Sequence, residues 1–249
     1  MINLDRDARR LAKMSDRLAR IGVPFERFGA LEARDDEPVF AGRPELTSGY
    51  FACARSHLTV LRRAMQRGHE RVIVLEDDAV FRDDTAERMA RIVPQLRGIE
   101  WDVFYFGLHL LEAGGRASEE LGVVRRSFHA HAYAVSKRAL PAMVEIIEAA
   151  MREGFHYDCH EMAGGRQLLR LYADPILAVQ EPNVSGVLGE AVDRLGQYFP
   201  PFDRGEFFSH CAEARGWPAA GSTKSETRNP VTLQPRAAAF AGNGGNFPV

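Results

Sequence analysis

The sequence contains no long apolar run and no excess of charge of either sign. Its 249 residues include 32 lysines and arginines against 34 aspartates and glutamates, a formal net charge of -2. Because proteins that follow a phosphate backbone need a surplus of basic side chains, we expect no nucleic-acid partner. No stretch approaches the roughly 20 apolar residues of a membrane span, and the amino terminus, MINLDRDARR, is charged where a signal peptide is apolar. We therefore expect a cytoplasmic protein, with at most peripheral contact at the inner face of a membrane.

Cysteine is also scarce. The three cysteines, Cys53, Cys159 and Cys211, are widely spaced and form no Cys-x-x-Cys pair. An odd number at this spacing predicts neither a disulfide framework nor a zinc knuckle, and it fits a reducing compartment. The hydrophobic fraction of 45% is that of an ordinary globular protein.

Strand-like and helix-like segments alternate along the chain. This order predicts a single α/β domain with a mostly parallel sheet and right-handed crossovers. The segment VIVL, residues 72–75, is apolar on both faces, which is typical of a central parallel strand. We expect strands at 1–4, 72–75, 101–107, 132–135 and 176–179, and helices at 7–21, 53–67, 85–96, 139–151 and 162–171.

Composition divides the chain into three parts. We predict one domain over residues 1–190 and an extension over 191–215 that packs on it. Residues 216–249 are dominated by Pro, Gly, Ala, Ser and Asn without a usable period, so we expect a flexible tail there.

Three consecutive carboxylates follow the VIVL segment: Glu76, Asp77 and Asp78. Such a cluster at the end of an apolar strand requires a positive charge among its members. In an extended chain Glu76 and Asp78 would point to one side, where two hard oxygen donors suit Mg²⁺ or Mn²⁺. The alternative is that these acids are helix caps or solvated loop residues.

Several motifs together resemble glycosyltransferase family 25, which includes bacterial lipooligosaccharide galactosyltransferases and collagen galactosyltransferases. The resemblance covers about residues 1–187 and is carried by INLDR (2–6), GYFACARSH (49–57), VLEDDAVF (74–81) and HAYAVS (131–136). It implies a GT-A-like fold with a Rossmann-like nucleotide-binding region and a Mn²⁺ or Mg²⁺ cofactor. It also implies a UDP-sugar donor, commonly UDP-galactose, and inversion at the anomeric carbon.

The resemblance also implies roles for the acids and their neighbours. Asp78 and Glu76 become the metal ligands. The predicted donor nucleotide-binding residues are Asn3, Asp5, Arg10, Ser56, His57, Glu76 and Asp77. Asn3 and Asp5 follow the first strand, and Arg10, one turn on, could reach a phosphate or lie on a solvated helix face. His57 could equally be a packed core histidine.

The acceptor side of the site is predicted from three residues. His131 and Tyr133 alternate along a strand, so they share a face and either line an acceptor pocket or pack in the core. An inverting transfer needs a base for the acceptor hydroxyl, and Asp158 is the candidate, with an N-cap of the following helix as its alternative role.

The sequence therefore predicts a metal-dependent inverting glycosyltransferase. It would move a sugar, galactose by default, from a UDP-sugar to a hydroxyl of a glycan such as lipooligosaccharide, including a lipid-linked one. Two positions depart from the family pattern, with Tyr50 in place of Glu and Gly186 in place of Asp. They motivate one alternative, a catalytically degenerate UDP-sugar-binding relative. A metal-dependent phosphohydrolase is a further alternative, because acids after a strand also serve phosphoryl chemistry.

Overall fold

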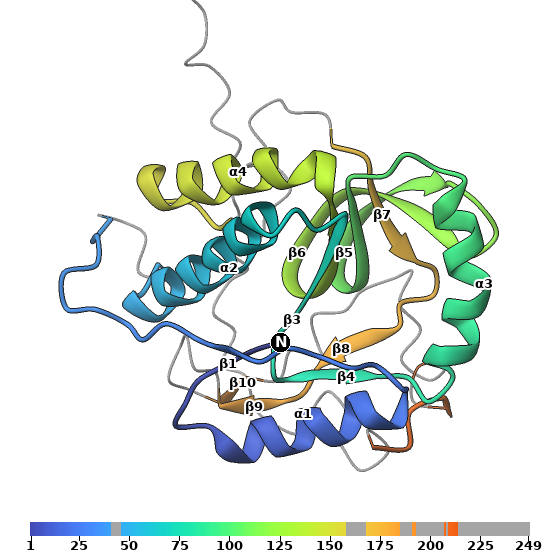
Figure 1. The fold of residues 1–249 in the computed structure, drawn as a ribbon, viewed down its shortest axis with the longest axis horizontal. Coiled ribbons are helices and arrows are strands. Elements are labelled where there is room, and N and C mark those ends of the chain that lie inside the picture. Colours follow the sequence, from blue (N-terminus) through green and yellow to red (C-terminus); the bar gives the residue numbers. More distant parts are fainter. Residues whose placement is uncertain (41–45, 158–167, 185–190, 193–206, 208, 214–249) are drawn as a thin grey trace, which may run out of the picture. The chain divides into compact units, whose positions relative to one another are not determined.

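Helices cover both faces of a mixed β-sheet (Figure 1). The computed structural model describes residues 1–40, 46–157, 168–184, 191–192, 207 and 209–213. All of these belong to one unit, Met1–Trp217, and a second unit, Pro218–Val249, lies outside the described residues. The predicted tail and most of the predicted extension therefore lie outside them too, and the boundary at residue 190 stays a prediction.

Four of the five predicted helical segments form helices in the described part of the chain. Their bounds are α1 Ala8–Arg20, α2 Ser48–Gln66, α3 Thr85–Arg97, the 3₁₀ turn η1 Lys137–Ala139 and α4 Leu140–Glu153. Helix α2 begins five residues before its predicted start because the Thr47 side chain caps it, accepting a hydrogen bond from the backbone N of Tyr50 at 3.2 Å. Helix α4 ends at Gly154, whose φ of 74° is left-handed.

The main sheet corrects the prediction of mostly parallel strands. The strands are β1 Ile2–Asn3, β2 Phe28–Gly29, β3 Arg71–Leu75, β4 Ala79–Phe81, β5 Val103–Arg116, β6 Leu121–Ser136, β7 Arg170–Ala173, β8 Ala178–Gln180, β9 Asn183–Val184 and β10 Ala191–Val192. Four of them pair in the order β3-β6-β5-β7, and only the β5–β7 pairing in that sheet is parallel over its described residues. The β5 and β6 segments were each predicted as a separate strand unit, but they run on to form one long hairpin.

Strand β3 also differs from its prediction. It lies at an edge of the four-stranded sheet, pairs antiparallel with β6, and leaves Ile73 50% exposed. Only Val74 and Leu75 of this strand are buried. The predicted helix 162–171 is contradicted at its end, because Arg170 and Leu171 belong to β7, while residues 162–167 lie outside the described chain.

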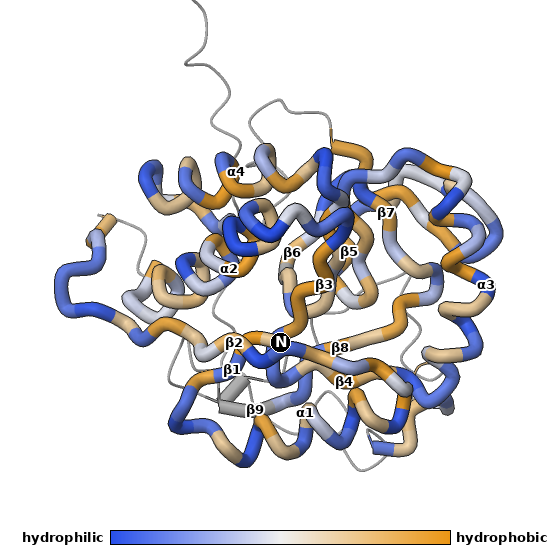
Figure 2. The backbone as a smooth tube through the Cα atoms, in the orientation of Figure 1, coloured by the Kyte–Doolittle hydropathy of each residue, from blue (hydrophilic) through white to orange (hydrophobic). Residues whose placement is uncertain are grey.

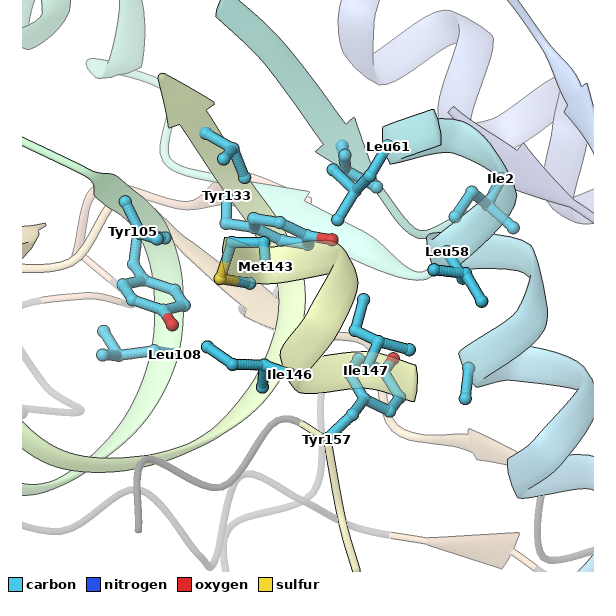
Figure 3. Close-up of a cluster of buried hydrophobic side chains, with 14 of the residues drawn as sticks. Ile2, Leu58, Leu61, Tyr105, Leu108, Tyr133, Met143, Ile146, Ile147 and Tyr157 are labelled. Atoms are coloured by element: carbon cyan, nitrogen blue, oxygen red, sulfur yellow. The ribbon is translucent and has the colours of Figure 1, made fainter. Parts of the chain in front are cut away.

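The core forms on both faces of the sheet because the strand side chains alternate. Val103 and Tyr105 of β5 pack on the side of α2 and α4, which lie next to each other (Figures 1 and 3). Phe104 and Phe106 pack on the other side, with apolar residues of α1 and α3. Figure 2 shows apolar residues concentrated along β4 and β8, whereas α1 alternates apolar and hydrophilic positions. Packing on both faces of the sheet therefore fixes the ends of its strands, and the acidic cluster lies at one of these ends.

The turn between β5 and β6 is held against α3 by ion pairs. Arg88 Nη2 lies 2.6 Å from Glu120 Oε2, and Arg91 Nε lies 2.7 Å from Glu120 Oε1. Burial alone would raise the pKa of Glu120, but hydrogen bonds from Arg91 and Arg88 bring it below its ordinary value of 4.5.

Acid should weaken this attachment. A carboxylate whose folded-state pKa is lowered contributes stability above its unfolded pKa and loses it as the pH falls through the folded value. Between about pH 6 and about pH 3 we expect the parent to lose about 1.5 kcal/mol more unfolding free energy than Glu120→Gln, the size of one charge-assisted hydrogen bond. Urea titrations at both pH values measure this, with exposed Glu119→Gln as the control. Parallel pH profiles for the parent and Glu120→Gln would contradict it.

Candidate functional site

The acidic cluster lies where the carboxyl ends of two strands meet. A parallel bridge joins Ile2 of β1 to Glu76, the residue after β3. The backbone N of Glu76 donates to the carbonyl of His131 on β6 at 2.8 Å, which fixes the strand end. Asn3 and Glu76 are thus brought to the same edge, as the rule for ligand sites in α/β sheets predicts.

A cavity of about 160 Å³ opens at this edge. It collects most of the predicted donor-site residues, namely Asn3, Arg10, Ser56, His57, Glu76, Asp77 and Asp78. Sequence reasoning assigned no role to three further lining residues: Cys53, Gln180 and Glu181. Cys53 carried a usable signal, because it precedes His57 by four residues in a helical segment.

The backbone turns within the acidic cluster instead of remaining extended. The backbone N of Ala79 donates to the carbonyl of Glu76 at 3.3 Å, and that of Glu181 donates to the carbonyl of Asp78 at 2.8 Å. The second contact attaches the turn to the residue after β8. The acids are therefore held by backbone contacts on both sides of the turn.

Arg10 supplies a positive charge that the cluster requires. Its Nη1 donates to Asp77 Oδ1 at 2.9 Å, and its Nη2 lies 3.7 Å from Asp78 Oδ2. Asn3 Nδ2 donates to Asp77 Oδ2 at 2.7 Å, so both oxygens of Asp77 are engaged by protein groups. Burial raises the pKa of Asp77 above its ordinary value, although Arg10 and Asn3 act against that shift. Asp77 thus orients Arg10 and Asn3 at the cavity.

His57 is fully buried and lies between the core and the cavity. Its Nδ1 is 2.9 Å from the hydroxyl of Tyr133, and its Nε2 is 3.5 Å from Glu76 Oε1. Its ring is stacked on that of Tyr133, with centroids 5.8 Å apart and planes at 11°. Figure 3 shows Tyr133 and Tyr157 within this packed region. His57 is therefore a core residue that also reaches the candidate site.

Ser56 and Asp5 are the two remaining predicted donor-site residues. The Ser56 hydroxyl donates to the carbonyl of Ala52 at 2.8 Å and accepts from the backbone N of Leu31 at 2.9 Å. Asp5 is not among the described lining residues; its carboxylate is 2.5 Å from Arg27 Nη2 and its side chain is 82% exposed.

The structure describes two of the three residues predicted on the acceptor side. His131 and Tyr133 are buried and, among the described residues, do not line the cavity. Their acceptor-pocket role stays a prediction. Asp158 lies outside the described residues.

The donor set at the cavity suits a hard divalent cation. Glu76 and Asp78 both line it, whereas both oxygens of Asp77 are engaged by Arg10 and Asn3. Carboxylate oxygens are the ligands that Mg²⁺ and Mn²⁺ prefer. Glu76 and Asp78 therefore have side chains of the right chemistry for a metal-ligand pair, and this role stays a prediction.

Tyr50, which departs from the family pattern, has a structural position at the start of α2. Its hydroxyl donates to the carbonyl of Phe155 and accepts from the backbone N of Tyr157 at 2.9 Å. Its side chain is almost fully buried, so these contacts tie the segment after α4 to α2.

We expect Tyr50→Phe to destabilise the protein by about 2 kcal/mol. The change removes the hydrogen bond to the Phe155 carbonyl and the buried one from the Tyr157 backbone N. Urea-induced unfolding followed by circular dichroism measures the loss. An unfolding free energy within about 0.5 kcal/mol of the parent's would show that these bonds do not hold the segment.

Comparison with known proteins finds relatives of one family. Residues 1–102 match the profile described as Glycosyltransferase family 25 (LPS biosynthesis protein). The chain is therefore similar to glycosyltransferase family 25 over this part of its length. A family 25 member from Aedes aegypti is 30% identical over 166 residues, 58% of this chain and 27% of that relative. One from Anopheles gambiae is 30% identical over 129 residues, 45% of this chain and 22% of that relative.

Some family 25 relatives bear names that mark them as inactive. The inactive family member 3 of Mus musculus is 34% identical over 64 residues, 25% of this chain and 11% of that relative. The chain thus spans about a quarter or less of the relatives it matches.

One solved structure resembles the chain only weakly. Mannose-1-phosphate geranyltransferase from Thermus thermophilus is 14% identical at a TM-score of 0.33, covering 68% of this chain and 52% of that one, too low to support an argument. Among the described residues, no helix combines the length and apolar character needed to cross a membrane.

Proposed function

We propose that this chain belongs to glycosyltransferase family 25 and is a metal-dependent inverting glycosyltransferase with a GT-A-like fold. It moves a sugar, galactose by default, from a UDP-sugar to a hydroxyl of a glycan such as lipooligosaccharide. The observation that supports this is the cavity at the ends of β1 and β3, where Arg10, Asn3 and the three consecutive carboxylates Glu76, Asp77 and Asp78 lie among the lining residues.

The cavity chemistry suits a diphosphate. Arg10 Nη2 is buried and has no hydrogen-bond partner among the described residues, so it has a donor available for a phosphate oxygen. The cavity of about 160 Å³ is smaller than the roughly 300–1,000 Å³ of a typical ligand pocket. It therefore fits the diphosphate portion of the donor, with the rest extending beyond it.

Glu76 and Asp78 are the residues that would hold Mn²⁺ or Mg²⁺. When bound, the metal supplies Lewis-acid stabilisation of the charge that develops on the departing UDP. Asn3 and Arg10, both fixed by Asp77, orient the donor beside them. Asp158 remains the proposed base that accepts the proton of the attacking hydroxyl.

The proposal is tested by turnover. The purified chain is incubated with Mn²⁺, a panel of UDP-sugars and truncated lipooligosaccharide, and the products are followed as released UDP and as a hexose mass increment on the acceptor. We expect both signals from one donor, with UDP-galactose first. Phosphate release from simple phosphate esters without a preference for uridine would instead indicate a phosphohydrolase.

A catalytically degenerate relative is the second candidate function. It is favoured by Tyr50, whose hydroxyl is engaged in structural contacts where the family pattern has a carboxylate, and by the relatives named inactive. This candidate predicts that UDP binds with metal while neither UDP release nor the mass increment occurs with any donor.

A further inference from the structure

A second set of metal-binding groups overlaps the acidic cluster. Cys53 and His57 are four residues apart on α2, so their side chains lie on the same helix face. Glu76 approaches them from the end of β3. One ligand atom from each of the three residues lies within 4.8 Å of the others. All three residues line the cavity.

The contacts of His57 leave its Nε2 able to bind a metal. It is fully buried, and its Nε2 has no hydrogen-bond partner among the described residues. When Nδ1 donates to the hydroxyl of Tyr133, 2.9 Å away, Nε2 carries the lone pair that a metal needs. The ring is packed between those of Tyr133 and Tyr157, with centroids at 5.8 and 5.3 Å. A ligand at Nε2 would therefore meet a fixed donor.

The geometry points to a site for a soft divalent cation, with Zn²⁺ as its type. We propose that Cys53, His57 and Glu76 bind this cation and leave a fourth position open to the cavity. A thiolate, an imidazole and a carboxylate are common zinc ligands, and sulfur distinguishes this set from the all-oxygen pair of Glu76 and Asp78. Zinc bonds of about 2.0–2.3 Å place tetrahedral ligands about 3.3–3.8 Å apart. The 3.5 Å between His57 Nε2 and Glu76 Oε1 already falls in that interval.

Sharing Glu76 has a consequence for the candidate activity. A cation held by Cys53, His57 and Glu76 withdraws Glu76 from the pair it forms with Asp78. Zn²⁺ should then compete with Mn²⁺-dependent UDP binding. This consequence rests on the proposed function, whereas the soft-metal site does not.

Cobalt spectroscopy tests the site without any substrate. Co²⁺ is titrated into the full chain, kept reduced by a non-thiol reductant, and absorption is recorded. We expect a near-ultraviolet thiolate-to-cobalt charge-transfer band and intense visible bands of four-coordinate cobalt, all displaced by Zn²⁺. Cys53→Ser should lose the charge-transfer band, and Cys211→Ser and Cys159→Ser should keep it. Absence of the band in the folded parent, or its survival in Cys53→Ser, would overturn the proposal.

Tyr133→Phe provides a second measurement, because Tyr133 acts on the metal only through His57. We expect this variant to bind Zn²⁺ about 10–100-fold more weakly in competition with a chromophoric chelator. A purely structural role of Tyr133 would lower thermal stability and leave zinc affinity unchanged in the folded protein.

Asp78→Asn separates the two proposals. It should keep the cobalt spectrum because Asp78 is not part of the Cys53, His57 and Glu76 set. A cobalt band in a parent that fails to bind UDP would refute only the proposed function. UDP binding in a parent without the band would refute only the soft-metal site.

Discussion

Asp78→Asn is expected to abolish metal-dependent UDP binding and to lower kcat/KM for sugar transfer about 1,000-fold. The substitution keeps the size of the side chain and removes one of the two carboxylates assigned to the metal. Lewis-acid stabilisation is worth several kcal/mol, and each 1.36 kcal/mol is a factor of ten in rate. The backbone contact from Glu181 to the carbonyl of Asp78 is unaffected by the change.

Asp36→Asn is the matched control for this prediction. Asp36 is exposed, and its substitution makes the same change in charge and size away from the cavity. Thermal unfolding of both variants shows whether each is folded, so that a loss of UDP binding is scored only on folded protein. Parent-like UDP affinity in Asp78→Asn would exclude Asp78 as a metal ligand.

Arg17→Met is expected to lower the unfolding free energy by about 3 kcal/mol. The Arg17 side chain is 2% exposed, and its Nη2 lies 2.6 Å from Glu181 Oε2 while its Nε donates to Glu213 Oε1 at 2.9 Å. Its Nη1 also donates to the carbonyl of Ala79 at 3.2 Å. Removing the guanidinium leaves two partly buried carboxylates with less positive charge beside them. Removing one partner of a buried ion pair is strongly destabilising because the remaining charge stays buried.

Arg20→Met is the control because it removes a cation from the same carboxylate at the surface. Arg20 Nη2 lies 2.8 Å from Glu213 Oε2, and its side chain is 62% exposed. An exposed pair is worth at most about 1 kcal/mol. Urea titrations of both variants give the comparison, and equal losses would show that burial of Arg17 does not set its contribution.

The Arg17 contacts also bear on the candidate site. Ala79 directly follows Asp78, so the hydrogen bond from Arg17 to the Ala79 carbonyl fixes the strand into which the acidic turn leads. Glu181, whose carboxylate pairs with Arg17, donates its backbone N to the Asp78 carbonyl. Loss of Arg17 is therefore expected to weaken UDP binding as well as stability.

The sequence predicted the parts of the fold that depend on local patterns. Apolar spacing located the helices, and the position of Glu76 after a strand placed it at a sheet edge with Asn3. The direction of strand pairing was missed because it depends on contacts far apart in the chain. Strand β5 runs on to Arg116, and the chain then turns back over residues 117–120 and pairs antiparallel with β6. Periodicity alone cannot distinguish this hairpin from two separate strands.

The candidate site was also predicted only in part. Arg10 was expected near a phosphate, but its contact with Asp77 required tertiary structure to be seen. Cys53 received no role because cysteine spacing was weighed only against other cysteines. Its relation to His57 was readable from the four-residue interval on α2, whereas the approach of Glu76 to both was not, because that contact joins distant parts of the chain.

Calorimetric titration of UDP into the full chain, with and without Mn²⁺, shows whether the cavity lined by Arg10, Glu76 and Asp78 binds the diphosphate of a UDP-sugar through a divalent metal. We expect saturable binding of UDP that requires Mn²⁺ and disappears in Asp78→Asn. Absence of UDP and UDP-sugar binding in both conditions, with the chain folded, would contradict it.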